Sequence, residues 1–87
     1  MMAQYFDSDE AGYLRWIMQH RNDGFIVNVG GGFAPKLHRA NQPCVTTPKR
    51  TNYTTHEYKK WCSTNQRELE TKKYDQPLTH CKVCFPR

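Results

Sequence analysis

The sequence predicts one small domain of the α+β class. One segment with helical periodicity comes first, and strand-like segments separated by polar stretches follow it. Only 37% of the 87 residues are hydrophobic, and the four cysteines include a C-x-x-C pair, Cys81 and Cys84. A chain of this size buries a thin core, and such chains commonly need a disulfide, a metal or a partner. We therefore expect residues 1–87 to form a single domain that is zinc-stapled, meaning held together by one zinc ion.

An amphipathic helix is predicted over residues 8–21. Asp7 and Glu10 have the spacing of a capping box, and an acidic first turn favours the helix start. Spacing of i, i+3 and i+4 predicts a buried stripe, with Trp16 beside it; the stripe is Tyr13, Leu14, Ile17 and Met18. Gly24 is expected to end this region in a left-handed conformation.

Three strands and a second helix are predicted after the first helix. Residues 25–29 and 36–40 have strand composition and flank a glycine-rich connection, and residues 56–62 form the third strand. These segments predict a three-stranded antiparallel sheet. Ser63 and Gln66 have capping-box spacing for a helix over residues 64–74, with Leu69 as its apolar anchor. The segment 78–87 is expected to be a C-terminal zinc knuckle.

The metal ligands are predicted from the cysteines. Tetrahedral zinc takes four sulfur or nitrogen ligands, and a C-x-x-C pair supplies two thiolates from one turn. The predicted set is Cys44, Cys62, Cys81 and Cys84. His38 is the alternative ligand, because it precedes Cys44 by a short spacer after a strand. His80 is expected to lie beside the site without binding the metal, and two disulfides are the rival interpretation of the four cysteines.

Zinc is favoured over disulfides by the expected compartment. No apolar run approaches the roughly 20 residues that cross a bilayer, and the opening residues do not have the pattern of a signal peptide. We therefore expect a cytoplasmic protein that does not bind membranes. Thiols stay reduced there and are available to a metal.

An enzymatic role is not expected. No set of nucleophile, base and orienting group can be named. The pair His56-Glu57 lacks the H-x-E arrangement of zinc deaminases. We therefore predict a structural zinc ion and no catalytic residues.

Positive charge is concentrated in the middle of the chain. The net charge is +5. Residues 1–23 hold four acidic and two basic side chains, whereas residues 36–60 hold six basic side chains and one acidic. Such asymmetry indicates a surface for a polyanion. The candidate nucleic-acid contacts are basic residues and the aromatic residues among them: Lys36, Arg39, Lys49, Arg50, Tyr53, Lys59, Lys60 and Trp61.

Two segments resemble known metal-binding modules. The ending Cys81-Lys82-Val83-Cys84-Phe85-Pro86 resembles the C-x-x-C-x-P ending of the metal-binding module in bacterial alkyl-DNA repair proteins. The longer pattern, which includes Leu37-His38-Arg39-Ala40 and Tyr58-x-Lys60-x-Cys62-Ser63, resembles small bacterial zinc modules, some of them attached to restriction-type or other DNA-acting proteins. The metal positions of that pattern match His38, Cys44, Cys62, Cys81 and Cys84. Gln42 and Pro43 lengthen its spacing between the histidine and the first cysteine.

The resemblance implies an accessory to a DNA-acting or defence-related system. The sequence therefore predicts a non-catalytic, zinc-stabilised nucleic-acid-binding module, for DNA or RNA. The alternative is a small protein-interaction or regulatory module of the phage-inhibitor type. In that alternative, the acidic first helix with Tyr5, Phe6 and Trp16 would contact a partner protein, and the zinc would be purely structural.

Overall fold

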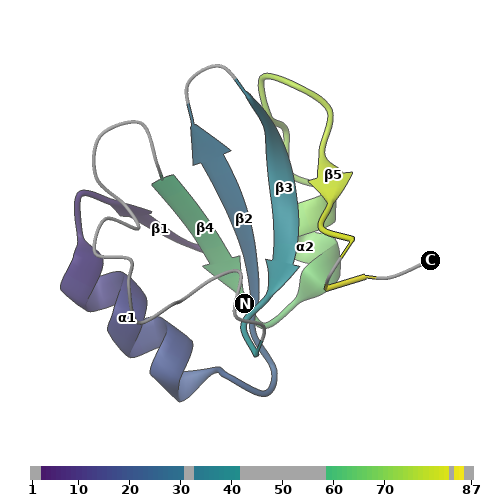
Figure 1. The fold of residues 1–87 in the computed structure, drawn as a ribbon. Coiled ribbons are helices and arrows are strands. Elements are labelled where there is room, and N and C mark those ends of the chain that lie inside the picture. The colour runs from purple at the N-terminus through teal and green to yellow at the C-terminus, as the bar shows by residue number, and fades with distance from the viewer. Residues whose placement is uncertain (1–2, 31–32, 42–58, 83, 86–87) are drawn as a thin grey trace.

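The fold is a mixed sheet with two helices (Figure 1). A computed structural model describes residues 3–30, 33–41, 59–82 and 84–85. In chain order, the elements are β1 (Gln4–Asp7), α1 (Glu10–Gln19), β2 (Phe25–Gly30), β3 (Phe33–Arg39), β4 (Lys59–Ser63), α2 (Gln66–Glu70) and β5 (Thr79–His80). The α+β class predicted from the sequence is confirmed.

The sheet is larger than predicted. Its strand order is β1-β4-β2-β3-β5. The three inner pairings, β1 with β4, β4 with β2 and β2 with β3, are antiparallel, whereas β5 pairs in parallel with β3. The sheet is therefore five-stranded and mixed, and the three-stranded antiparallel prediction was incomplete. It omitted two short strands, β1 and β5, which form the two edges.

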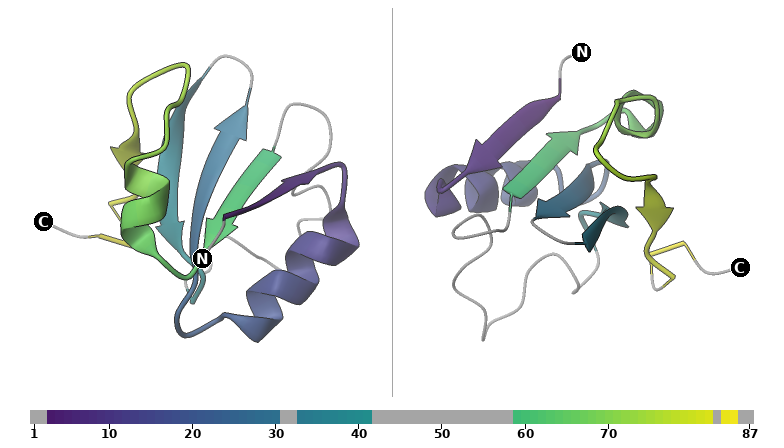
Figure 2. Two further views of the ribbon diagram at one scale, coloured as in Figure 1. Left: turned by 180° about the vertical axis from the view of Figure 1, so that it is seen from behind. Right: turned by 90° about the horizontal axis from the view of Figure 1, so that it is seen from above.

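The two faces of the sheet carry separate cores. Ile26 in β2 lies opposite Cys62 in β4 and His38 in β3, so these three side chains share one face. That face packs against α1 and contains the buried cluster Phe6, Tyr13, Trp16, Ile17, Ile26, Ala40 and Cys62. On the other face, Val27 and Leu37 pack with Leu69 of α2. We call these the α1 face and the α2 face; the further views show the helices on either side of the sheet (Figure 2).

Helix α1 begins two residues later than predicted and is rotated relative to the predicted stripe. Asp9 caps it by accepting a hydrogen bond of 2.9 Å from the backbone N–H of Gly12. The buried side chains are Tyr13, Trp16 and Ile17, whereas Met18 is 76% exposed. Trp16 therefore belongs to the core and Met18 does not, which reverses the prediction for these two residues.

Gly24 lies between α1 and β2, where its backbone approaches the end of α1 closely. Its N–H donates a hydrogen bond of 2.7 Å to the carbonyl of His20. A Cβ atom at this position would lie 2.7 Å from that carbonyl oxygen and 2.8 Å from the ring of Trp16. Its φ lies outside the left-handed region. Glycine is therefore required here because a Cβ atom has no space. Gly24 does not adopt the predicted left-handed conformation.

Candidate metal centre

A buried group of metal-ligand side chains lies where β3 and the C-terminal segment meet. The ligand atoms of His38, Cys81 and Cys84 all lie within 4.8 Å of one another. The relative exposure of these three residues is 9%, 8% and 4%. The Sγ atom of Cys84 lies 3.8 Å from Nδ1 of His38. The group can hold a metal ion.

The spacing of the group suits a tetrahedral ion. Around zinc, two sulfurs lie about 3.8 Å apart and a sulfur and a nitrogen about 3.6 Å apart, given bond lengths of about 2.3 and 2.05 Å. The observed 3.8 Å between sulfur and nitrogen is close to that value. Thiolate and imidazole donors are the set that borderline transition-metal ions prefer. An ion therefore fits here after only small side-chain shifts.

Backbone hydrogen bonds fix the cysteines beside β3. Cys81 donates from its N–H to the carbonyl of Leu37 over 3.0 Å, and Phe85 donates to the carbonyl of Cys81 over 2.8 Å. The hydroxyl of Thr79 donates to the carbonyl of Pro35 over 3.0 Å. The C-terminal turn, defined here as the described residues 81–82 and 84–85, is thus attached to the strand that carries His38.

Arg39 holds the C-terminal turn from the other side of β3. Its Nε atom donates to the carbonyl of Cys84 over 3.1 Å. Its guanidinium lies 4.4 Å from the ring centre of Phe85 and 5.6 Å from that of Phe25. Neighbouring residues of a strand point to opposite faces. β3 therefore directs His38 to the ligand group and Arg39 to the backbone of the turn, where its positive charge would offset thiolates bound to a metal.

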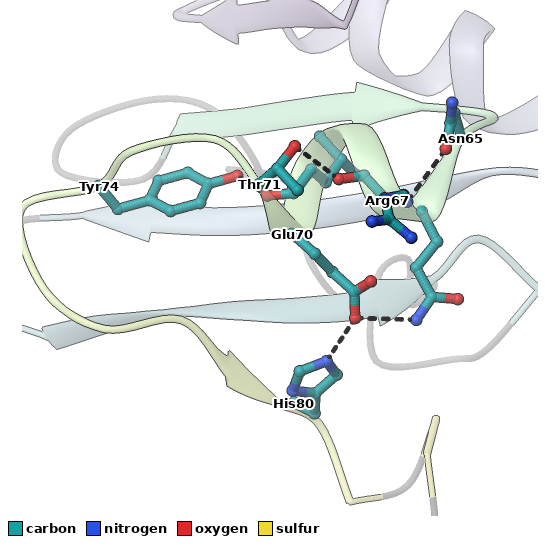
Figure 3. A network of polar contacts seen from close by, with 8 residues as sticks. Asn65, Arg67, Glu70, Thr71, Tyr74 and His80 are labelled. Carbon is teal, nitrogen blue, oxygen red and sulfur yellow. Dashed lines mark hydrogen bonds and ion pairs between the residues drawn. The ribbon is translucent and has the colours of Figure 1, made fainter.

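A second polar contact ties β5 to α2 (Figure 3). Nε2 of His80 lies 3.0 Å from the carboxylate of Glu70, which also accepts a hydrogen bond of 3.2 Å from Gln66. These hydrogen bonds, that of His80 above all, lower the pKa of Glu70. His80 is exposed and turned towards α2, in agreement with the expectation that it lies beside the site.

Cys62 is placed differently from the prediction. It is fully buried in the α1-face core, and this burial raises the pKa of its thiol well above the ordinary value. Cys62 and His38 point to the same face, but β2 lies between their strands. The backbones of β4 and β3 are therefore about 9.6 Å apart, which is twice the spacing of adjacent strands. Cys62 is a core residue, and His38 takes a place in the ligand group. Cys44 lies outside the described residues.

Those predicted nucleic-acid contacts that the structure describes are divided between the two faces of the sheet. Lys60 is 3% exposed, lies on the α1 face and donates a hydrogen bond of 2.6 Å to Asn28. Arg39 is engaged with the C-terminal turn. Lys36 is exposed and Lys59 is half-buried. Lys60 and Arg39 are therefore structural, and three predicted contacts lie outside the described residues: Lys49, Arg50 and Tyr53.

Trp61 is half-buried on the α2 face and has two neighbours that the sequence analysis did not connect with it. The ring of Tyr5 lies 4.5 Å from its ring, centre to centre. Nζ of Lys72 lies 3.7 Å from the ring centre of Trp61. Tyr5 lies beside Trp61 because β1 pairs with β4. In the sequence, the adjacent aromatic residues Tyr5 and Phe6 were the weak signal of that strand.

Comparisons with protein-family models, with curated proteins and with solved structures found no match to this chain. Within the described part of the chain, neither helix has the length and apolar character to cross a bilayer.

Proposed function

We propose that this protein is a non-catalytic, zinc-stabilised module that binds nucleic acid. The observation that carries the proposal is the buried group of His38, Cys81 and Cys84 at the edge of the sheet. The zinc part of the proposal follows from the chemistry of those donors, and the nucleic-acid part from the charge of the chain.

Zinc is the ion that best suits one imidazole and two thiolates. Structural zinc sites are tetrahedral, and Cys₃His is one of their common ligand sets. Cys44 is our proposed fourth ligand. It follows the described residue Asn41 by three positions, and three residues of chain reach about 10 Å. The proposed ligand set is therefore His38, Cys44, Cys81 and Cys84.

The metal would act on stability. His38 and Cys84 are 46 positions apart in the chain. A bond network across so long a loop removes conformational entropy from the unfolded chain and so favours the folded state. The two cores are small, and β5 has only two residues. The ion would fix the edge of the sheet, where the fewest backbone hydrogen bonds act.

Binding of nucleic acid is supported by the net charge of +5. Lys36, Lys73 and Lys82 are exposed, and Lys59 and Lys72 are half-buried. Lysines at a surface attract phosphates and release counterions, so we expect binding that weakens steeply as salt is raised.

Two measurements test the proposal. Elemental analysis of the reduced protein should find one zinc per chain. Fluorescence anisotropy with labelled random DNA and RNA should show binding at low salt that falls as salt is raised. Zinc without nucleic-acid binding would leave only the structural part of the proposal. Two disulfides without metal would refute the zinc part.

The alternative function, a protein-interaction module, has one specific observation in its favour. Met18 is 76% exposed on α1, and Leu14, one turn earlier, is half-buried. An exposed apolar side chain beside a half-buried one on the same helix suits a protein partner. A module that binds a partner protein through α1, and no nucleic acid at low salt, would favour this alternative. Met18→Glu should then abolish the protein complex.

A further inference from the structure

An aromatic pair lies on the α2 face at the β1 edge of the sheet. Tyr5 is opposite Trp61 in the β1–β4 ladder, and their rings are tilted by 36° at 4.5 Å between centres. Tyr5 is 43% exposed, and Trp61 is half-buried. The Tyr5 ring thus reaches solvent on the face of the sheet, where it packs against Trp61.

The exposure of this pair follows from the size of α2. The helix has five residues, and its buried residue, Leu69, packs with Val27 and Leu37. One row of side chains runs across the α2 face as Leu37, Val27, Trp61 and Tyr5. The first two are fully buried, whereas Tyr5 at the end of the row is not. The helix covers the middle of the sheet and leaves the β1 edge of that face to the aromatic pair.

Positive charge accompanies the aromatic pair. Lys72 has its ammonium group 3.7 Å from the ring centre of Trp61. Lys59 lies two positions before Trp61 on β4 and therefore points to the same face. Opposite Lys59 is Asp7, the one acidic neighbour that the ladder places here. The pKa of the Tyr5 phenol is raised, first by partial burial and second by the negative charge of Asp7.

We infer that this surface, formed by Tyr5, Trp61, Lys59 and Lys72, binds unpaired nucleic acid by stacking a base on the exposed ring of Tyr5, which Trp61 supports, and by holding phosphates with the two lysines. The inference rests on the proposed nucleic-acid function and assigns it a place and a ligand class. Stacking requires a free base face, which a single strand offers and the interior of a duplex does not. A neutral sugar would also stack on such rings, but the two lysines and the net charge of +5 favour a polyanion.

The test uses the whole zinc-loaded protein and labelled 12-nucleotide probes: oligo-dT, oligo-U and a 12-base-pair duplex. Tyr5→Thr removes the exposed ring and retains strand propensity. Lys72→Gln removes the charge over Trp61, and the matched control Lys73→Gln removes the adjacent exposed lysine. Asp7→Asn removes the opposing charge. Circular dichroism and zinc content verify that each variant is folded.

The expected result is tighter binding of single strands than of the duplex, with quenching of Trp61 fluorescence by the bound strand. Tyr5→Thr should weaken binding of single strands by about tenfold, given the usual contribution of one stacked base. Lys72→Gln should weaken binding more than Lys73→Gln does, and Asp7→Asn should strengthen it.

Three results would contradict this inference, and they differ in whether the proposed function is also refuted. Equal effects of Tyr5→Thr, Lys72→Gln and Lys73→Gln, in a protein that does bind nucleic acid, would overturn the surface and leave the proposed function intact. Tighter binding of the duplex would overturn the single-strand assignment. A wild-type protein that binds none of the probes at low salt would refute the proposed function and this inference together.

Discussion

Replacing Cys62 and Cys84 in turn by alanine distinguishes a core cysteine from a proposed metal ligand. Both residues are buried, with 0% and 4% of their surface exposed, and each variant loses one sulfur atom. Their surroundings differ. Cys62 packs among apolar side chains of the α1-face core, whereas the Sγ atom of Cys84 lies 3.8 Å from Nδ1 of His38. The two substitutions should therefore respond differently to zinc.

The size of each effect follows from those surroundings. Removing the Cys62 sulfur loses the transfer free energy of one small apolar group, about 0.8 kcal/mol, plus a cavity cost, which makes about 1–1.5 kcal/mol in total. This cost should be the same with and without zinc. Cys84→Ala should lose the stabilisation that zinc provides, about 4 kcal/mol when free zinc is about 1,000 times the dissociation constant.

Urea unfolding followed by circular dichroism measures both effects. Wild type, Cys62→Ala and Cys84→Ala are each unfolded in zinc and in excess chelator, and the difference between the two conditions is the zinc stabilisation. We expect Cys62→Ala to keep that difference and Cys84→Ala to abolish it. If Cys62→Ala also abolished the difference, Cys62 would bind the metal and the placement of His38 in its stead would be refuted.

Three further predictions concern the surroundings of the site and the two cores. Arg39→Lys removes a planar guanidinium that donates a hydrogen bond to the carbonyl of Cys84 and lies near the rings of Phe25 and Phe85. Zinc affinity should therefore fall about tenfold, as measured by competition with a chromophoric chelator. The control Lys36→Gln, which removes an exposed charge from the same strand, should leave that affinity unchanged. Gly24→Ala should lower the free energy of unfolding by about 1–3 kcal/mol in urea, because its Cβ would overlap the carbonyl of residue 20; a change below about 0.5 kcal/mol would show that the backbone moves aside freely. Burial raises the pKa of Tyr74 from 10.0 to about 12, so the folded state holds the phenol proton more tightly than the unfolded state. The resulting stability is complete below pH 10 and is lost as the pH rises towards 12, and Tyr74→Phe should flatten this part of the stability profile.

The sequence predicted both helices and the three inner strands, although α2 (Gln66–Glu70) is shorter than the predicted 64–74, and it missed the two edge strands. Helix α1 and strands β2, β3 and β4 were predicted because each has enough residues to display a period or a strand composition. β1 has four residues with one buried side chain, and β5 has two exposed residues. Such strands exist because a neighbouring strand offers hydrogen bonds, which is a tertiary effect that local pattern does not contain.

The rotation of α1 shows the same limit at the level of one helix face. Met18 and Trp16 each fit an i, i+3, i+4 series, so periodicity alone does not choose between them. The choice is made by the approach of Gly24 to the ring of Trp16, together with a ring contact of 4.6 Å between Trp16 and His20. Both contacts depend on the turn after the helix.

Two members of the group that can hold a metal ion, Cys81 and Cys84, belong to the predicted motif, and the third, His38, depends on strand order. Cys81 and Cys84 follow from the C-x-x-C spacing. His38 and Cys62 were both placed on strands in the sequence analysis, and both do point to the α1 face. Only the pairing of β5 with β3, and not with β4, brings the cysteine pair next to His38.

The strand order also bears on how the chain assembles. The hairpin of β2 and β3 joins neighbours in sequence, whereas contacts such as those of Ala3 with Glu68 and Arg39 with Cys84 span 65 and 45 positions. Distant pairings are slow to form, because a long loop must be closed before any contact compensates. We expect the hairpin to form first and β5, with its cysteines, to join last. An ion that completes only this final step would leave the folding rate almost unchanged and would slow unfolding, so its main contribution would be a longer lifetime of the folded state.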